Sequence, residues 1–148
     1  MPDHAGVYLP PPVLYIGAAR GLQRLVPIAP APAALRVVAP VLAAGWAGLT
    51  LPIPAGFRRA GTSLVPIRPS TKLVMGGPYR VTRNPMYLGL LLRYLALGVW
   101  TRLTWALVLT PALVALVQAL VIARAERYLA LKFGADYAVY LRRVRRWM

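Results

Sequence analysis

The chain has no cysteine, and among its 148 residues it has one histidine and three acidic residues. The absence of cysteine excludes disulfide bonds and thiol chemistry. The single histidine, His4, leaves too few ligands for a metal site, so we expect no metal. The first residues, MPDHAGVYLPPP, carry no basic stretch ahead of an apolar core, so we expect no cleavable signal peptide. Any chemistry of this chain must therefore come from groups other than thiols and metal ligands.

Polar residues are also scarce, because 59% of the chain is hydrophobic and 14% is charged. A soluble domain needs more polar surface than this. The apolar runs at 33–51 and 103–122 come close to or reach the roughly 20 residues with which a helix crosses a bilayer. The composition predicts an all-α integral membrane protein, a helical bundle in contact with membrane lipids.

The net charge of +15 would fit a nucleic-acid binder, but the basic residues gather beside the apolar segments. Six lie between residues 51 and 86, and seven follow residue 122. Because basic residues mark the cytoplasmic side of membrane proteins, we place both clusters in the cytoplasm and expect no nucleic-acid partner. We expect the protein to lie in a bacterial cytoplasmic (inner) membrane.

The apolar pattern predicts about four transmembrane segments in a single domain spanning residues 1–148. The N-terminal part, 10–54, holds a span at 10–27 that Arg20, Gln23 and Arg24 interrupt, and a span at 33–51 that the prolines of LPIPAG end. The part at 57–148 holds a hairpin of two spans, 86–100 and 103–122, joined at Thr101-Arg102 and kinked at Pro111. The topology of the first segment stays open.

Beyond the hairpin, the sequence predicts a helix that continues to Phe133 and stops at Gly134. A second, amphipathic helix then follows on the cytoplasmic side. Its apolar positions fall at helical spacing and its other positions are rich in arginine; the apolar set is Tyr137, Tyr140, Leu141 and Val144. This helix either lies on the membrane surface, held by anionic headgroups, or is a basic tail that only sets orientation.

The stretch GGPYRVTRNPMYLG contains a predicted helix start. Asn84 is a favoured N-cap and Pro85 a favoured first helical residue. The free N–H groups of such an end, with Arg80 and Arg83 beside them, suit a carboxylate or phosphate. An ordinary capped helix with basic flanks explains the same residues, so both interpretations stay open.

Glu126 is the acidic residue without an evident local role, because Asp136 suits a helix cap or turn and Asp3 lies near the start of the chain. It follows the last apolar segment, between Arg124 and Arg127. It either forms an ion pair with a nearby arginine or faces a cationic group of a ligand.

Two motifs, TKLVMGGPYRVTRNPMYLG and ERYLALKFGADYAVYLRRVRRW, occur in this order around the hairpin. Over roughly residues 57–147 the chain resembles the isoprenylcysteine carboxyl methyltransferase and phospholipid methyltransferase family. The resemblance implies a membrane enzyme that moves a methyl group from S-adenosylmethionine to a lipophilic, lipid or prenylated acceptor, with its active site facing the cytoplasm. It implies catalytic roles for Glu126 and Arg83. The cofactor contacts that it implies are Thr71, Lys72, Leu73, Val74, Tyr79, Asn84, Pro85, Met86, Tyr87 and Glu126.

The chain departs from the family pattern in three places. Asn84 stands where the family usually has histidine, Ala125 replaces the first residue of a usual Glu-Glu pair, and Val121 stands where the family has an arginine one helical turn before that pair. The last two changes put a prenylcysteine acceptor in doubt. The acceptor chemistry stays open, since a carboxylate needs no base whereas an ammonium must lose a proton. Two alternatives remain: an NADPH-dependent membrane reductase of sterol type, and a non-catalytic membrane protein on the same scaffold.

Arg93 lies about two turns into the predicted span at 86–100. A charge at that depth usually faces the bundle interior or a wet cavity, although a long arginine can also snorkel to the interface. If Arg93 faces inward, it is a substrate-binding residue that meets the acidic headgroup or carboxylate of an acceptor arriving from the lipid.

Overall fold

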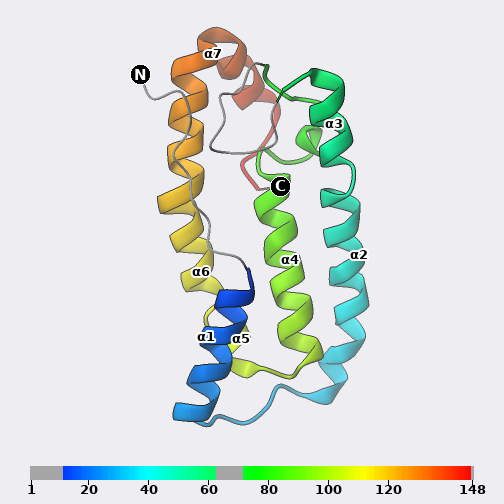
Figure 1. Cartoon of the computed structure of the whole chain (residues 1–148), viewed down its shortest axis with the longest axis vertical. Coiled ribbons are helices and arrows are strands. Elements are labelled where there is room, and N and C mark those ends of the chain that lie inside the picture. Colours follow the sequence, from blue (N-terminus) through cyan, green and yellow to red (C-terminus); the bar gives the residue numbers. More distant parts are fainter. Residues whose placement is uncertain (1–11, 63–71, 148) are drawn as a thin grey trace.

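The chain folds into helices joined by short connections (Figure 1). The computed structural model describes residues 12–62 and 72–147. Within these ranges there is no strand, which confirms the all-α class. In chain order the elements are α1 (Pro12–Leu25), the 3-10 helix η1 (Ala33–Val38), α2 (Ala39–Thr50), α3 (Ile53–Ala60), the 3-10 helix η2 (Gly77–Arg80), α4 (Pro85–Trp100), α5 (Thr104–Val108), α6 (Thr110–Val117), the π-helix η3 (Gln118–Ile122) and α7 (Ala123–Arg143).

The second predicted span is longer than expected. η1, α2 and α3 follow one another with little interruption, and the 28 residues Ala33–Ala60 are long and apolar enough to cross a membrane. As predicted, α2 ends at Thr50, just before the prolines, but the apolar helical run continues because α3 begins at Ile53. Pro52 is the N-cap of α3 and Pro54 stands in its first turn, where a missing N–H breaks no helical hydrogen bond.

The first predicted span is shorter than expected. α1 has 14 residues, or about 21 Å at about 1.5 Å per residue, less than the roughly 30 Å of a hydrocarbon core. Figure 1 shows it beside α5, reaching only part of the height of the molecule. Among the described residues, Ala33–Ala60 is the one helix that satisfies both length and composition for a membrane span. A bundle of four full-length spans is therefore not established.

The predicted hairpin is present. α4 ends at Trp100, Thr101 and Arg102 form the turn, and the chain returns through α5, α6, η3 and α7 (Figure 1). The return limb is interrupted at Leu109, two residues before Pro111, in agreement with the kink predicted there. Gly134 also behaves as predicted, because its φ of 45° and ψ of −114° divide α7 in two.

The amphipathic half of α7 packs differently from the prediction. Tyr137 and Tyr140 are buried, with exposed fractions of 2% and 6%, whereas Leu141 is exposed. The two tyrosines therefore face the protein rather than a membrane surface.

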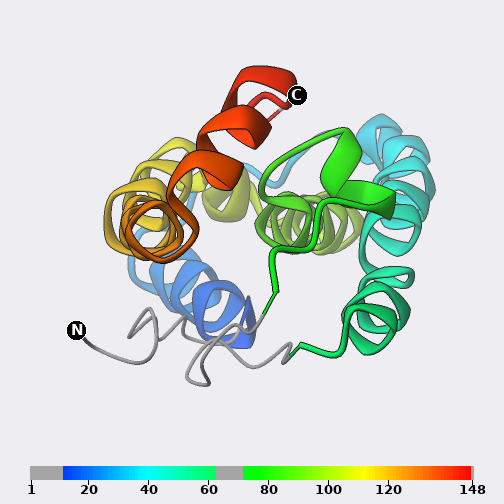
Figure 2. The same ribbon diagram turned by 90° about the horizontal axis from the view of Figure 1, so that it is seen from above.

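Small residues bring the helices together. A Cβ atom built on Gly89 would overlap the Cγ2 atom of Thr50 on α2, and one built on Gly98 would lie 2.9 Å from the Cβ of Ala106 on α5. Close backbone approach through glycine is the usual way in which membrane helices gain packing contacts. Seen from above, α4 lies between the α2–α3 and α6–α7 limbs (Figure 2).

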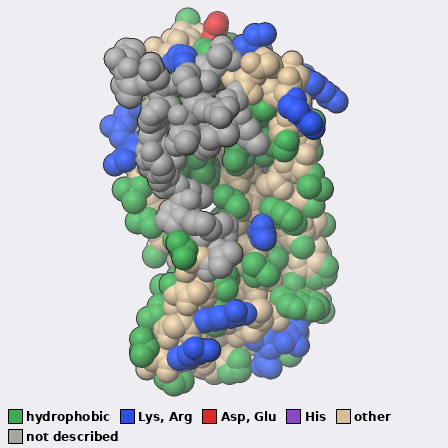
Figure 3. Space-filling model, in the orientation of Figure 1, with side chains coloured by type: hydrophobic (Ala, Val, Ile, Leu, Met, Phe, Trp, Pro, Cys, Tyr) green, Lys and Arg blue, Asp and Glu red, His purple; other side chains and the backbone are tan. Residues whose placement is uncertain are grey.

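The two ends of the molecule carry most of the basic side chains, and a largely hydrophobic band separates them (Figure 3). The first turn of α4 begins below the tops of α3 and α7, with η2 and the residues around it above (Figure 1). This recessed helix start is the place where the two sequence motifs meet.

Candidate functional site

Glu126 on α7 is held by two arginines at the recessed start of α4. Arg146 donates from Nε to Oε1 at 3.1 Å and from Nη2 to Oε2 at 2.6 Å. Arg83 donates from Nη1 to Oε1 at 3.3 Å. The side chains of Glu126 and Arg83 are only 15% and 16% exposed, against 41% for Arg146. The ion pair left open by the sequence thus exists, but its partners are distant in sequence and are not the adjacent Arg124 and Arg127.

Asn84 stands at the N-cap of α4 as predicted, but its side chain does not cap the helix. Its Nδ2 instead donates to the carbonyl oxygen of Arg146 at 3.0 Å. The Thr82 hydroxyl donates to the same oxygen at 3.0 Å and accepts from the Asn84 backbone N–H at 3.2 Å. Since Pro85 has no N–H, the backbone donors of the first turn begin at Met86, and no side-chain cap is bound to them.

Two further contacts close the cluster. The backbone N–H of Arg83 donates to the carbonyl of Arg145 at 3.0 Å. The indole Nε1 of Trp147 donates to Oε1 of Gln118 at 3.1 Å, at the first residue of the π-helix. Residues 145–147 therefore touch both the segment before α4 and the limb that carries Glu126.

Tyrosines form one wall of the site. The Tyr140 hydroxyl donates to the carbonyl of Tyr79 at 2.8 Å. Burial raises the pKa of Tyr140 to about 12, with Tyr137 reinforcing the shift and Arg83 opposing it. Burial also raises the pKa of Tyr137, reinforced by Glu126 and opposed by Arg83 and Arg146. Both phenols are therefore neutral at physiological pH.

The remaining predicted cofactor contacts surround this cluster. Lys72 and Leu73 line a cavity of about 750 Å³ together with Arg80, Tyr140 and Arg143. Leu73, Val74 and Tyr79 line a second cavity, of about 380 Å³, against α3. In the first turn of α4, Pro85 is buried while Met86 and Tyr87 are half-buried. Thr71 lies outside the described residues.

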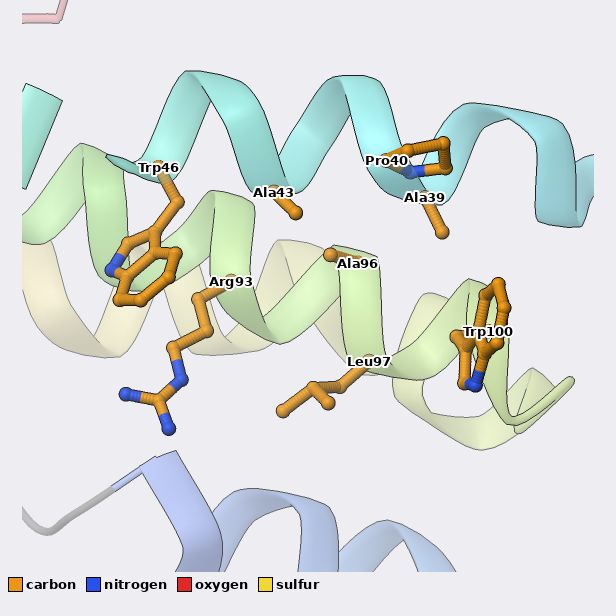
Figure 4. A pocket seen from close by; sticks show the side chains of 8 residues that line it. All are labelled: Ala39, Pro40, Ala43, Trp46, Arg93, Ala96, Leu97 and Trp100. Atoms are coloured by element: carbon orange, nitrogen blue, oxygen red, sulfur yellow. The ribbon is translucent and has the colours of Figure 1, made fainter. Parts of the chain in front are cut away.

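Arg93 lies apart from the cluster. It is nine positions beyond Asn84, which is about 13 Å along α4 at about 1.5 Å per residue. Its guanidinium carbon sits 5.2 Å from the ring centroid of Trp46, a cation–π contact with α2. Figure 4 shows both side chains beside a cavity of about 330 Å³ between α2 and α4, lined otherwise by Ala39, Pro40, Ala43, Ala96, Leu97 and Trp100.

The sequence did not reveal Arg146, Thr82, Gln118 or Tyr137 as members of the site. Arg146 is one of four arginines in RRVRR, and no local pattern separates it from its neighbours. In the sequence Thr82 and Gln118 stand out only as polar residues. The structure buries Thr82 and half-buries Gln118. Within the described ranges, no three histidine, cysteine or acidic side chains come together as metal ligands would.

Comparisons with known proteins agree with the two-motif arrangement. A protein of Haemophilus influenzae (strain Rd), described only as uncharacterized, is 45% identical over 65 residues, which are 43% of this chain and all of that protein. No solved structure matches. The family model described as phospholipid methyltransferase matches residues 35–136, well over half of the chain, from η1 into the second half of α7. The chain belongs to the phospholipid methyltransferase family.

Proposed function

We propose that this protein is a membrane methyltransferase that moves a methyl group from S-adenosylmethionine to a lipophilic acceptor. The observation that carries the proposal is the meeting of Arg83, Asn84 and Glu126, from two motifs 42 positions apart, in a chain of this family. If the two motifs bind one ligand together, both limbs of the hairpin must contribute residues to a single site.

The residues present fit the cofactor. S-adenosylmethionine carries a carboxylate, and the uncapped first turn of α4 with Arg83 beside it suits an anionic group. The two cavities beside residues 73–79 have volumes in the usual range for ligand pockets of roughly 300–1,000 Å³. Lys72, Leu73, Val74 and Tyr79 line these cavities and would hold the cofactor there. Met86 and Tyr87, in the first turn of α4, and Thr71 belong to the same proposal.

When bound, S-adenosylmethionine supplies an activated methyl group for an in-line displacement. The protein then needs to hold donor and acceptor in line and to exclude water, without a nucleophilic side chain of its own. Glu126 already accepts three hydrogen bonds from two guanidinium groups. Those bonds occupy the carboxylate and hold it away from other partners, which favours an acceptor that needs no base.

Arg93 is the residue that we propose for guiding the acceptor. Its distance from Asn84 argues against contact with the reacting group itself. Its position beside the apolar cavity between α2 and α4 fits an amphiphile whose apolar part lies against these helices. A water-soluble acceptor would need no such approach through the membrane.

We also propose that the site end of the molecule faces the cytoplasm of a bacterial cell. Arg58, Arg59, Arg80, Arg142 and Arg143 lie on elements at this end, whereas the opposite end carries Arg24, Arg36 and Arg102 around the turns (Figure 1). The larger basic cluster marks the cytoplasmic side. In this arrangement residues 10–54 form the N-terminal part of a single domain, and 57–148 hold the cofactor motifs, the hairpin and the basic amphipathic helix.

Calorimetry on the purified protein in detergent tests the function. We expect S-adenosylmethionine and its demethylated product to bind, and NADPH to bind far more weakly or not at all. Binding of NADPH without S-adenosylmethionine would instead favour a reductase, and absence of binding for both would favour a non-catalytic protein. The orientation is tested separately with single cysteines at positions 68, 102 and 142, where labelling of 68 and 142 from opposite faces would overturn it.

A further inference from the structure

Residues 145–147 contact both limbs of the hairpin at the candidate site. The backbone carbonyls of Arg145 and Arg146 accept hydrogen bonds from Thr82, Arg83 and Asn84. The Arg146 guanidinium holds both oxygens of Glu126, and the Trp147 indole reaches the π-helix at Gln118. These three consecutive residues therefore join the start of α4 to the return limb of the hairpin.

We propose that Arg146 is a positioning residue that assembles the cofactor site. This inference rests on the proposed function, because it assigns Arg146 a role in that site. Through its side chain Arg146 fixes the orientation of the Glu126 carboxylate, and through its carbonyl it fixes the turn at Thr82 and Asn84. Neither role requires contact with the cofactor or acceptor.

The hydrogen-bond geometry explains why one residue has two effects. A bidentate pair of a guanidinium and a carboxylate restrains rotation of both groups, which a single contact does not. With Glu126 fixed, its third bond sets the position of Arg83, whose Nε is buried without a partner among the described atoms. Meanwhile the Arg146 carbonyl draws the Asn84 side chain away from the helix, which leaves the first turn of α4 uncapped.

The neighbouring arginine provides a matched control. Arg145 and Arg146 carry the same charge and follow one another, but the exposed Arg145 contributes only its carbonyl to these contacts. Arg146→Met and Arg145→Met therefore remove the same charge and keep the backbone. Only Arg146→Met removes the pair with Glu126.

Two measurements on the full chain in detergent test the proposal. Hydrogen exchange of the Arg83 amide, which is bonded to the Arg145 carbonyl, reports docking of residues 145–147 without any cofactor. We expect at least about tenfold faster exchange in Arg146→Met, which loses both charge-assisted hydrogen bonds to Glu126, and no change in Arg145→Met. Calorimetry with S-adenosylmethionine should show binding weakened by about the same factor in Arg146→Met alone, and Arg146→Lys should restore part of both.

The outcomes separate the two proposals. Equal exchange in the two methionine variants, or weaker cofactor binding without faster exchange, would overturn the positioning role. Faster exchange in Arg146→Met in a protein that binds no S-adenosylmethionine would support assembly by Arg146 and overturn the proposed function. If Arg146→Met does not fold, the same two measurements are compared between Arg146→Lys and Arg145→Lys. Lysine keeps the charge but cannot make the bidentate contact with the carboxylate.

Discussion

The guanidinium of Arg83 lies 3.3 Å from the carboxylate of Glu126, although 43 positions separate the two residues. Arg83 precedes the outgoing limb of the hairpin, and Glu126 follows the apolar segment of the return limb. Their ion pair closes the open end of the hairpin, and Arg146 occupies the other side of the carboxylate. Partly buried charges of this kind depend strongly on their partners.

Glu126→Gln should weaken S-adenosylmethionine binding at least tenfold, because two arginines lose the charge that orients them. It should also lower the free energy of unfolding by about 1–3 kcal/mol. Asp136→Asn is the control for stability, since Asp136 is exposed and its replacement should change stability by no more than about 0.5 kcal/mol. It is no control for binding, because Asp136 lines the larger cavity. Calorimetry and denaturant unfolding in detergent measure the two effects of Glu126→Gln, and unchanged cofactor binding would reduce Glu126 to a structural ion-pair residue.

Gly89→Ala should destabilise the packing of α4 on α2 by about 1–3 kcal/mol, because the added methyl group meets the short side chain of Thr50. Gly48→Ala is the matched control on α2, where an added Cβ has nothing within 4 Å. There the better helix propensity of alanine should leave stability unchanged or raise it by up to about 1 kcal/mol. Unfolding in detergent compares them, and a stable Gly89→Ala protein would show that α2 and α4 are not in close contact.

Arg93→Leu should raise the Michaelis constant for a lipid-like acceptor about tenfold and leave the dissociation constant of S-adenosylmethionine unchanged. We expect this split because Arg93 lies beside the cavity between α2 and α4, away from Asn84. Arg124 is exposed, as Arg93 is, but it lies on α7 and does not line that cavity, so Arg124→Leu removes the same charge and serves as the control. Full activity of Arg93→Leu on a lipid-like acceptor, or methylation of water-soluble molecules alone, would rule out the proposed role in substrate binding.

Stability should fall above about pH 10, because a buried phenol with a raised pKa stays neutral in the folded state while it ionises in the unfolded chain. For Tyr140 the contribution is complete below pH 10, the usual tyrosine pKa, and is lost as the pH rises through about 12. Melting temperatures between pH 8 and 11.5 should decline less steeply in Tyr140→Phe than in the unmodified protein. That variant should also lose the hydrogen bond to Tyr79 at every pH. Identical slopes would mean that Tyr140 is not buried.

The helices of the hairpin follow from local sequence. Asn84-Pro85 predicts the start of α4, Thr101-Arg102 the turn and Gly134 the break in α7, and each lies where predicted. These features depend on the backbone preferences of a few adjacent residues. Those residues can be read directly from the sequence. At Pro52 and Pro54 the prediction was incomplete: α2 ends before them as expected, but α3 begins there, because a proline that ends one helix is equally able to begin the next.

The partners of the site residues depend on tertiary structure. The sequence identified Glu126 as an acid without a local role, and it identified Asn84 as a cap, but it did not indicate that Arg146 binds both. Four arginines in RRVRR are equivalent by composition. Only the path of the chain beyond α7 brings one guanidinium to Glu126 and one carbonyl to Asn84. A hydrogen bond forms only when its donor and acceptor atoms are about 3 Å apart. Residues tens of positions apart in the sequence come that close only after the helices have packed.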